Sequence, residues 1–228
     1  MRSTVQELLD GLHAAADAPE RRRWAAACAR GLGLGGLAVS VGQELVWFSD
    51  DTSARLEDLQ FVFGQGPSRH LAEATGTREF PDLTRLLQMQ WPQFAAAAEE
   101  LGIAALFVWP LHIGAVRVGT MTGYRRATGP LTARESSDGR VVADALARQL
   151  LDGWPDNGEP DRVCGAGAGS VGLHRAEVHQ ATGVLSELLG IPLAEALDRL
   201  RARAFASGRS LPDSARHILQ QELPRDDV

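Results

Sequence analysis

The chain has 228 residues, with 44% hydrophobic and 23% charged side chains and a formal net charge of −6 at pH 7. These values are typical of a globular protein with one or two domains, and the acidic balance excludes a chain that is basic throughout. No apolar run approaches the roughly 20 residues that a membrane-spanning helix needs, and the N-terminus does not resemble a secretion signal, so we expect a cytoplasmic protein with no membrane partner.

Residues 1–150 alternate the signals of helices and strands. Apolar residues at helical spacing predict amphipathic helices around residues 5–12 and 24–28. Short β-rich runs at residues 37–41 and 44–48 predict two strands, joined by a tight turn at Gly42-Gln43.

The middle of this region predicts shorter elements. A helix over residues 56–63 runs into a turn at 64–67, and residues 68–75 have the pattern of a short helix. A brief strand is expected at residues 78–80 and a helix at 92–101.

The longest β signal comes next in the chain. Residues 103–113 and 116–125 predict a hairpin around Gly114, and residues 131–150 predict a long closing helix. Helices at both ends with antiparallel hairpins between them predict an α+β fold.

A stretch without a core pattern separates this region from the C-terminal part. It is rich in turn formers and acidic residues, and then in glycine and alanine. We therefore assign residues 1–151 to a first domain with N-terminal helices, 152–170 to a flexible linker and 171–223 to a second domain.

Three short helices are predicted in residues 171–223. Their apolar stripes recur at spacings of three and four: Val178, Ala181, Leu185 and Leu188; Ala196, Leu197, Leu200 and Ala204; Leu211, Ala215, Ile218 and Leu219. Gly190 and Gly208 end the first two helices, and Ser210 with Asp213 is a capping signature for the third. So small a bundle buries little surface, which is typical of an output module that presents a face to a macromolecule, often as a dimer.

These residues also carry a family resemblance. The segment resembles an ANTAR domain in these residues: Gln180-Ala181-Thr182-Gly183-Val184-Leu185, Ala196-Leu197, Leu200-Arg201, Ala204, Ser207, Arg209, Leu211 and Asp213-Ser214-Ala215-Arg216. ANTAR domains are three-helix RNA-binding modules of bacterial transcription antiterminators. The resemblance implies a homodimer that binds RNA stem-loops in a leader transcript and prevents a terminator hairpin from forming.

Residues 31–150 resemble a GAF domain. The motifs that carry this resemblance are Gly64-Gln65-Gly66-Pro67, Asp82-Leu83, Trp91-Pro92, Gly102-Ile103, Pro110-Leu111 and Gly119. GAF domains are sensor modules with a six-stranded antiparallel sheet, flanking helices and a ligand pocket on one face. The expected fold is therefore a GAF-type sheet followed by a small three-helix ANTAR bundle.

The resemblance to ANTAR domains implies an RNA-binding surface made by Arg201, Arg209, Ser207 and Arg216, with Arg201 and Arg209 as the first choices. We also expect Arg203, on the same helix, to contact RNA. All 23 basic residues of the chain are arginine, which pairs bidentately with phosphate and stacks on bases. An alternative stays open, because Glu195 lies four residues before Arg199 and Asp198 lies three before Arg201. In that alternative, Arg199 and Arg201 form ion pairs with these acidic residues on a solvated surface and do not contact RNA.

Two positions depart from the ANTAR pattern. The family commonly has lysine where this chain has Thr182 and asparagine where it has Gly208. Each change removes a donor near the expected RNA-binding surface, which lowers the expected affinity or specificity.

A ligand pocket in the first domain is expected to be lined by Phe63, Trp91, Phe107 and Trp109, although ordinary core packing explains the same aromatics. No resident cofactor is predicted. Two alternatives for this domain have equal weight. Either it binds an unidentified small molecule as its signal, or it only dimerises or contacts proteins. Cys28 and Cys164 do not lie where a bilin-attaching cysteine is expected.

No catalytic or metal-binding pattern is present in the sequence. The six histidines lack the spacing of metal ligands, and the glycine-rich segments follow no strand. We therefore predict a regulator that is not an enzyme, in which the GAF-like domain controls RNA binding and antitermination. The alternative is a helical domain that only dimerises or docks on a protein, since residues 171–223 hold six arginines and six acidic residues and are neutral.

Overall fold

The computed structural model describes residues 4–15, 17–42, 44–69, 76–83, 90–152 and 169–222. The chain divides into two units, Met1–Ala168 and Gly169–Val228. The first combines strands and helices and the second is helical, which agrees with the fold class predicted from the sequence.

An antiparallel sheet organises the N-terminal unit. Its strands are β1 (Gly36–Val41), β2 (Glu44–Phe48), β3 (Arg78–Phe80), β4 (Ala105–Ile113) and β5 (Val116–Arg125). They lie in the order β2-β1-β5-β4-β3, and every neighbouring pair is antiparallel. The predicted strand bounds are confirmed to within two residues. The described part of the chain has five strands, one fewer than the resemblance to GAF domains implies.

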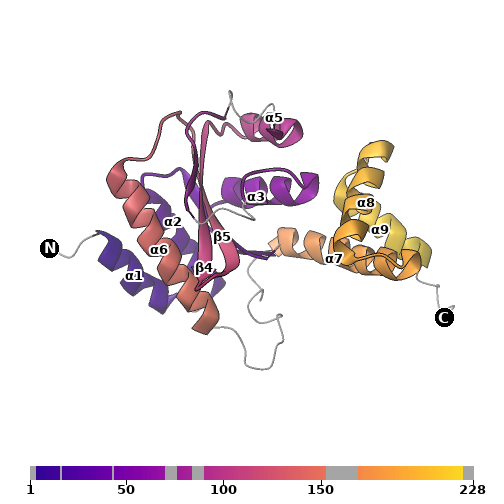
Figure 1. Cartoon of the computed structure of the whole chain (residues 1–228), viewed down its shortest axis with the longest axis horizontal. Coiled ribbons are helices and arrows are strands. Elements are labelled where there is room, and N and C mark those ends of the chain that lie inside the picture. Colours follow the sequence, from indigo (N-terminus) through magenta and orange to yellow (C-terminus); the bar gives the residue numbers. More distant parts are fainter. Residues whose placement is uncertain are drawn as a thin grey trace. The chain divides into compact units, whose positions relative to one another are not determined.

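Helices cover both faces of this sheet (Figure 1). One face packs against α1 (Thr4–Ala14), α2 (Ala18–Gly31) and α6 (Ala133–Asp152), and the other against α3 (Asp51–Phe63) and α5 (Pro92–Glu100). Side chains alternate between the two faces along β4, as strand geometry requires. Phe107 and Trp109 therefore join the core beneath α2 and α6, whereas Leu106 joins the core beneath α3 and α5.

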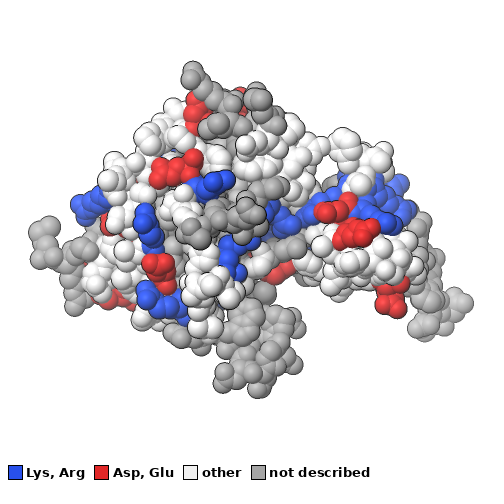
Figure 2. All heavy atoms as spheres, viewed as in Figure 1, with Lys and Arg blue, Asp and Glu red and all other residues white. Residues whose placement is uncertain are grey.

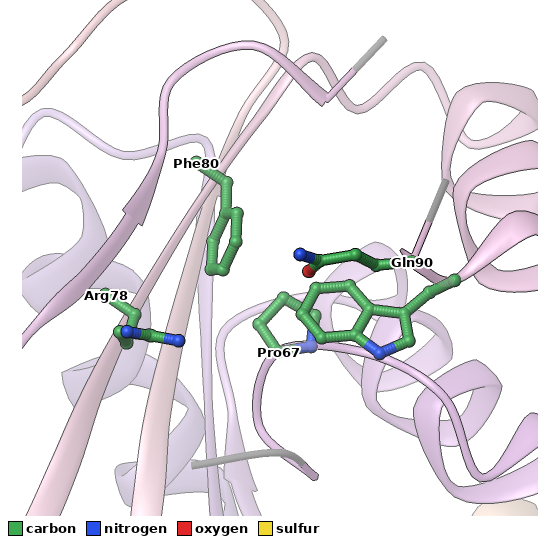
Figure 3. A pocket seen from close by; sticks show the side chains of 5 residues that line it. Pro67, Arg78, Phe80 and Gln90 are labelled. Carbon is green, nitrogen blue, oxygen red and sulfur yellow. The ribbon is translucent and has the colours of Figure 1, made fainter. Parts of the chain in front are cut away.

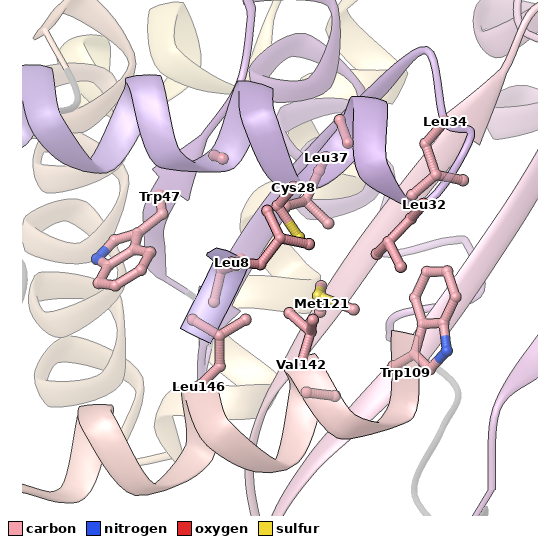
Figure 4. Close-up of a cluster of buried hydrophobic side chains, with 14 of the residues drawn as sticks. Leu8, Cys28, Leu32, Leu34, Leu37, Trp47, Trp109, Met121, Val142 and Leu146 are labelled. Carbon is pink, nitrogen blue, oxygen red and sulfur yellow. The ribbon is translucent and has the colours of Figure 1, made fainter. Parts of the chain in front are cut away.

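The core beneath α1, α2 and α6 is built around tryptophans and leucines (Figure 4). Trp24 packs edge-on against Trp47 with the ring centroids 5.2 Å apart, and its indole N–H donates a 2.8 Å hydrogen bond to the carbonyl of Leu8. Cys28 is fully buried in the same cluster, and this burial raises its pKa to about 12. The thiol is therefore a packing group and not a nucleophile.

Helix α3 begins five residues earlier than the sequence pattern predicted. Asp50 and Ser53 form a reciprocal capping box, in which the Asp50 carboxylate accepts from the Ser53 N–H at 2.8 Å. This cap holds a first turn that has no apolar stripe, so the hydrophobic spacing alone missed it.

Parts of two predictions lie outside the described residues. Residues 67–69 form a turn, and the remainder of the short helix expected at 68–75 is not described. Helix α6 continues to Asp152, and α7 (Gly169–Leu189) begins before the predicted end of the linker. Residues 153–168 between them are not described.

The C-terminal unit contains α7, α8 (Leu193–Ser207) and α9 (Leu211–Glu222), and each helix contacts the other two. Most residues of the predicted stripes are buried: Val178, Ala181, Ala196, Leu197, Leu200, Ala204, Leu211, Ala215 and Ile218. Gly190 and Gly208 adopt φ angles of 63° and 64° and end α7 and α8, as predicted.

Leu185 and Leu219 are half-buried, and Leu188 is the one residue of the predicted apolar stripes that is exposed, at 56%. It lies ten residues after Val178, which at roughly 100° per residue rotates it about 80° from the buried face.

Gly139 in α6 packs directly on the buried ring of Trp109. A Cβ at this position would lie 2.6 Å from Cε2 of the indole, so Gly139→Ala forces the ring or the helix to move. We expect a loss of about 1 to 3 kcal/mol in unfolding free energy for the N-terminal unit, even though alanine favours helix. Urea denaturation followed by circular dichroism measures this loss.

Gly183→Ala is the matched control for that substitution. Gly183 also lies in a helix, α7, but nothing lies within 4 Å of its added Cβ. The control should raise the stability of its unit by up to about 1 kcal/mol. Equal stabilisation by both substitutions would contradict the packing described for Trp109.

Candidate functional site

The apolar stripe of α8 decides which of its arginines are available to a partner. Ala196, Leu197, Leu200 and Ala204 face α7 and α9 and are buried. At about 100° per residue, this places Arg199 and Arg203 on one flank of the helix and Arg201 on the other.

Arg201 is held by the bundle itself. Its side chain is only 12% exposed, and its guanidinium donates to the Asp198 carboxylate at 2.8 Å. Burial lowers the pKa of the Arg201 guanidinium, and the hydrogen bond and the charge of Asp198 act in the opposite direction. Arg199 pairs with Glu195 at 2.8 Å, so the alternative of intrahelical ion pairs is confirmed for both residues.

Arg216 on α9 bridges two acidic residues. Its Nε lies 3.0 Å from Glu177 on α7, and its Nη1 lies 2.9 Å from Asp213 one turn earlier. The hydrogen bond to Glu177 raises the pKa of the Arg216 guanidinium. Arg216 therefore links α7 to α9, and the two carboxylates compete with any external anion for its guanidinium.

Arg203 and Arg209 differ from these paired arginines. Both are exposed, and within the described ranges neither guanidinium has a hydrogen bond or an ion pair. Ser207 lies between them, and its hydroxyl donates to the Arg203 carbonyl at 2.9 Å. These two guanidinium groups are the ones that the structure leaves ready for a phosphate.

The basic residues of this unit are concentrated in one stretch of its sequence. Residues 199–212 hold four arginines and no acidic residue, although residues 171–223 as a whole are neutral. Figure 2 shows basic side chains gathered on the part of the unit where α8 lies, with a few acidic side chains beside them. Averaging the charge over the whole segment hid this run from the sequence analysis.

The two departures from the ANTAR pattern have different settings. Thr182 is only 4% exposed, and its hydroxyl donates to the Val178 carbonyl at 2.7 Å, so its side chain is not on the surface. Gly208 is exposed at the left-handed C-cap of α8, and a Cβ there would meet nothing within 4 Å. Asparagine also tolerates this conformation, so the backbone does not require glycine.

A hollow of about 360 Å³ opens on the α3 and α5 side of the N-terminal sheet (Figure 3). It is lined by Pro67, Arg78, Phe80, Gln90 and Trp91. The ring of Trp91 packs against that of Phe80 with centroids 5.8 Å apart, and Arg78 supplies the charge of the lining.

Of the four aromatics predicted for a pocket, Trp91 lines this hollow. Phe63 packs against the core on the same side of the sheet. Phe107 and Trp109 are 0% and 1% exposed on the opposite side, so the sheet separates them from Trp91. The structure therefore does not bring the four together.

The turn at residues 64–67 forms part of the wall of the hollow. The buried side chain of Gln60 accepts the Ser68 N–H at 2.9 Å and so fixes the position of Pro67. The sequence analysis missed Arg78 and Gln90 as lining residues, because they share no motif and only the fold brings them near Pro67.

No three His, Cys, Asp or Glu side chains of the described residues lie together in a way that would hold a metal ion. His70 and the side chain of His174 lie outside what the structure describes. Of the helices with described positions, none combines the length and apolarity that crossing a membrane requires.

Measurements of protein stability test the difference in burial between Arg201 and Arg203. Arg201→Ala removes a buried side-chain stem and leaves Asp198 without this partner, so we expect a loss of about 1 kcal/mol or more. Arg203→Ala, two residues away on the same helix, should change stability by less than about 0.5 kcal/mol. Denaturation of the full chain measures both, and equal effects would contradict the burial of Arg201.

Solved structures similar to the chain include GAF domains. The chromophore-binding domain of a bacteriophytochrome from R. palustris aligns at 16% identity and a TM-score of 0.47, over 65% of this chain and 60% of that one. The GAF domain of a phosphoenolpyruvate-protein phosphotransferase from Coxiella burnetii aligns at 11% identity and 0.48, over 65% and 91%. Free methionine-R-sulfoxide reductase from Neisseria meningitidis aligns at 13% and 0.45, over 64% and 85%. Likeness at this level implies nothing about a ligand or an activity.

Sequence comparison is informative for the C-terminal unit. Among curated proteins, none matches the chain significantly. The family model of the ANTAR domain matches residues 173–219, a range that contains α8 and most of α7 and α9. The chain therefore carries an ANTAR domain at residues 173–219, and this domain follows an α+β unit that resembles a GAF domain.

Proposed function

We propose that this protein is a cytoplasmic transcription regulator whose ANTAR domain binds stem-loops of a leader RNA and promotes antitermination. The observation that carries the proposal is the acid-free run of residues 199–212, which places the exposed Arg203 and Arg209 at the C-terminal end of α8. Guanidinium groups without a protein partner are suited to phosphate, because they lose no ion pair on binding it.

The free and paired arginines have different roles in this proposal. Arg203 and Arg209 make the first phosphate contacts, and the hydroxyl oxygen of Ser207 accepts a hydrogen bond from the RNA. Arg201 supports α8 through its pair with Asp198, so Arg203 replaces it among the first choices. Glu177 and Asp213 compete with RNA for Arg216, so we assign it a secondary contact.

In this proposal the N-terminal unit controls the ANTAR domain by a population shift. A signal that binds one arrangement of the homodimer more tightly than another changes how the two ANTAR domains are presented to RNA. The hollow beside Trp91 is the place where we expect a small-molecule signal. Arg78 at its edge favours an anion.

One observation supports a second candidate function for the helical domain. Leu188, Leu189 and Leu193 surround the turn between α7 and α8 and are 56%, 47% and 61% exposed. Apolar side chains gathered at one turn are typical of a surface that meets a protein or a second copy of the chain. In that case the helical domain only dimerises or docks, and it does not bind RNA.

RNA binding is tested with the full chain and a library of RNA hairpins with randomised loops, from which the tightest binder is selected. Arg203→Ala and Arg209→Ala should each weaken binding of that hairpin by about fivefold to tenfold, roughly 1 kcal/mol. Each should also reduce the slope of log Kd against log salt concentration by about 1, because one phosphate contact is lost. Filter binding at several salt concentrations measures both quantities.

The matched control is Arg134→Ala, which removes the same charge from an arginine whose side chain is 75% exposed in the N-terminal unit. It should leave affinity and salt slope unchanged. A wild-type chain that enriches no hairpin, but binds itself or a protein, would overturn RNA binding in favour of the second function.

A further inference from the structure

Phe205 on α8 is the most exposed large hydrophobic side chain in the described part of the molecule, at 75%. It lies one turn after Arg201 on the flank of α8 that points away from Arg199 and Arg203. An aromatic ring on a helix surface is unusual, since burying a phenylalanine stabilises a protein by roughly 1.5 to 3 kcal/mol.

The fold of the bundle does not use this ring. The buried stripe of α8 is complete without it, because Ala196, Leu197, Leu200 and Ala204 make the contacts with α7 and α9. The backbone of Phe205 has a structural role, in which its carbonyl accepts the Gly208 N–H at 3.1 Å and helps to end the helix. A residue of any type supplies this carbonyl, so the end of the helix does not explain why the side chain is a phenylalanine.

The surroundings of Phe205 indicate what the ring contacts. It lies inside the run of residues 199–212, which contains four arginines and no acidic residue. Just after the helix end, the N–H of Arg209 donates to the Ala204 carbonyl at 3.0 Å, which keeps this residue close to the last turn of α8. An exposed apolar ring on a helix that also carries unpaired basic residues suits a ligand that combines flat apolar faces with negative charge.

Unpaired nucleotides have this combination of properties. Proteins that recognise single-stranded RNA loops stack splayed bases on aromatic side chains and hold the adjoining phosphates with basic groups. The unpaired charges of Arg203 and Arg209 at the same end of α8 favour a polyanion over a neutral protein surface.

Resting on the proposed RNA binding, we propose that Phe205 stacks on an unpaired base of the bound RNA loop, with Arg209 on a neighbouring phosphate. The arginines supply affinity that depends on salt. Phe205 supplies a contact that depends on an unpaired base and is absent from a fully paired stem.

The test compares Phe205→Ala, Phe205→Leu and Phe205→Trp in the full chain with the hairpin selected from the library of randomised loops. Loss of one base stack should weaken binding of the alanine variant by about 5- to 150-fold. The leucine variant, apolar but without a π-face, should lose nearly as much, and the tryptophan variant should retain the affinity. The salt slope should not change, because no charge is lost.

A 2-aminopurine label at each loop position in turn supplies a second readout. The fluorescence at one loop position should fall when the wild-type chain binds, and this change should be absent with Phe205→Ala. Circular dichroism of each variant confirms that the helices are intact, as expected for a side chain that is 75% exposed.

The outcomes separate the two proposals. If the wild-type chain selects a hairpin and Phe205→Ala binds it equally tightly, base stacking is overturned and RNA binding stands. If the alanine variant instead changes the oligomeric state in sedimentation while RNA affinity is kept, Phe205 meets a second copy of the chain and base stacking is again overturned. If the wild-type chain selects no hairpin, both proposals fail.

Discussion

The packing of α8 against α7 and α9 is the constraint on which the proposed function of this protein depends. Four small or aliphatic side chains, Ala196, Leu197, Leu200 and Ala204, bury one face of the helix and so fix its rotation about its own axis. Once that face is fixed, each arginine of α8 has a defined flank and a defined set of neighbours. The left-handed Gly208 then ends the helix and directs Arg209 back toward its last turn. The position of the proposed binding surface is therefore a consequence of core packing.

Local pairing matters more than net charge for such a surface. Residues 171–223 are neutral overall, yet four of their six acidic residues are engaged by arginine: Glu195 with Arg199, Asp198 with Arg201, and Glu177 and Asp213 with Arg216. The more exposed of these pairs, those of Arg199 and Arg216, contribute little to stability. The four ion pairs do determine which arginines are available to a ligand. They engage Arg199, Arg201 and Arg216 and leave Arg203 and Arg209 with their full hydrogen-bonding capacity.

The sequence predicted the elements well where a local pattern determines them. The hairpin at residues 103–125 and the helix ends at Gly190 and Gly208 follow from β-branched runs and glycine, and the structure has them nearly as expected. The pairs of Arg199 and Arg201 also followed from helical spacing. Features that depend on tertiary packing could not be predicted from the sequence. They are the burial of Arg201 and Thr182, the ion pair between Arg216 and Glu177, and the position of Arg78 and Trp91 in the lining of one hollow. Phe205 was not singled out from the sequence, because it lies outside the apolar stripe of α8 and its exposure depends on how the bundle packs.

The measurement that tests this account most directly is ultraviolet crosslinking of the full chain to its selected RNA hairpin, followed by mass spectrometry of the crosslinked peptides. The account predicts nucleotide adducts on peptides from residues 199–212, with the modified nucleotide in the loop of the hairpin. Adducts confined to the N-terminal unit, or to α7 alone, would show that RNA binds elsewhere and would contradict the assignment of the acid-free arginine run as the binding surface.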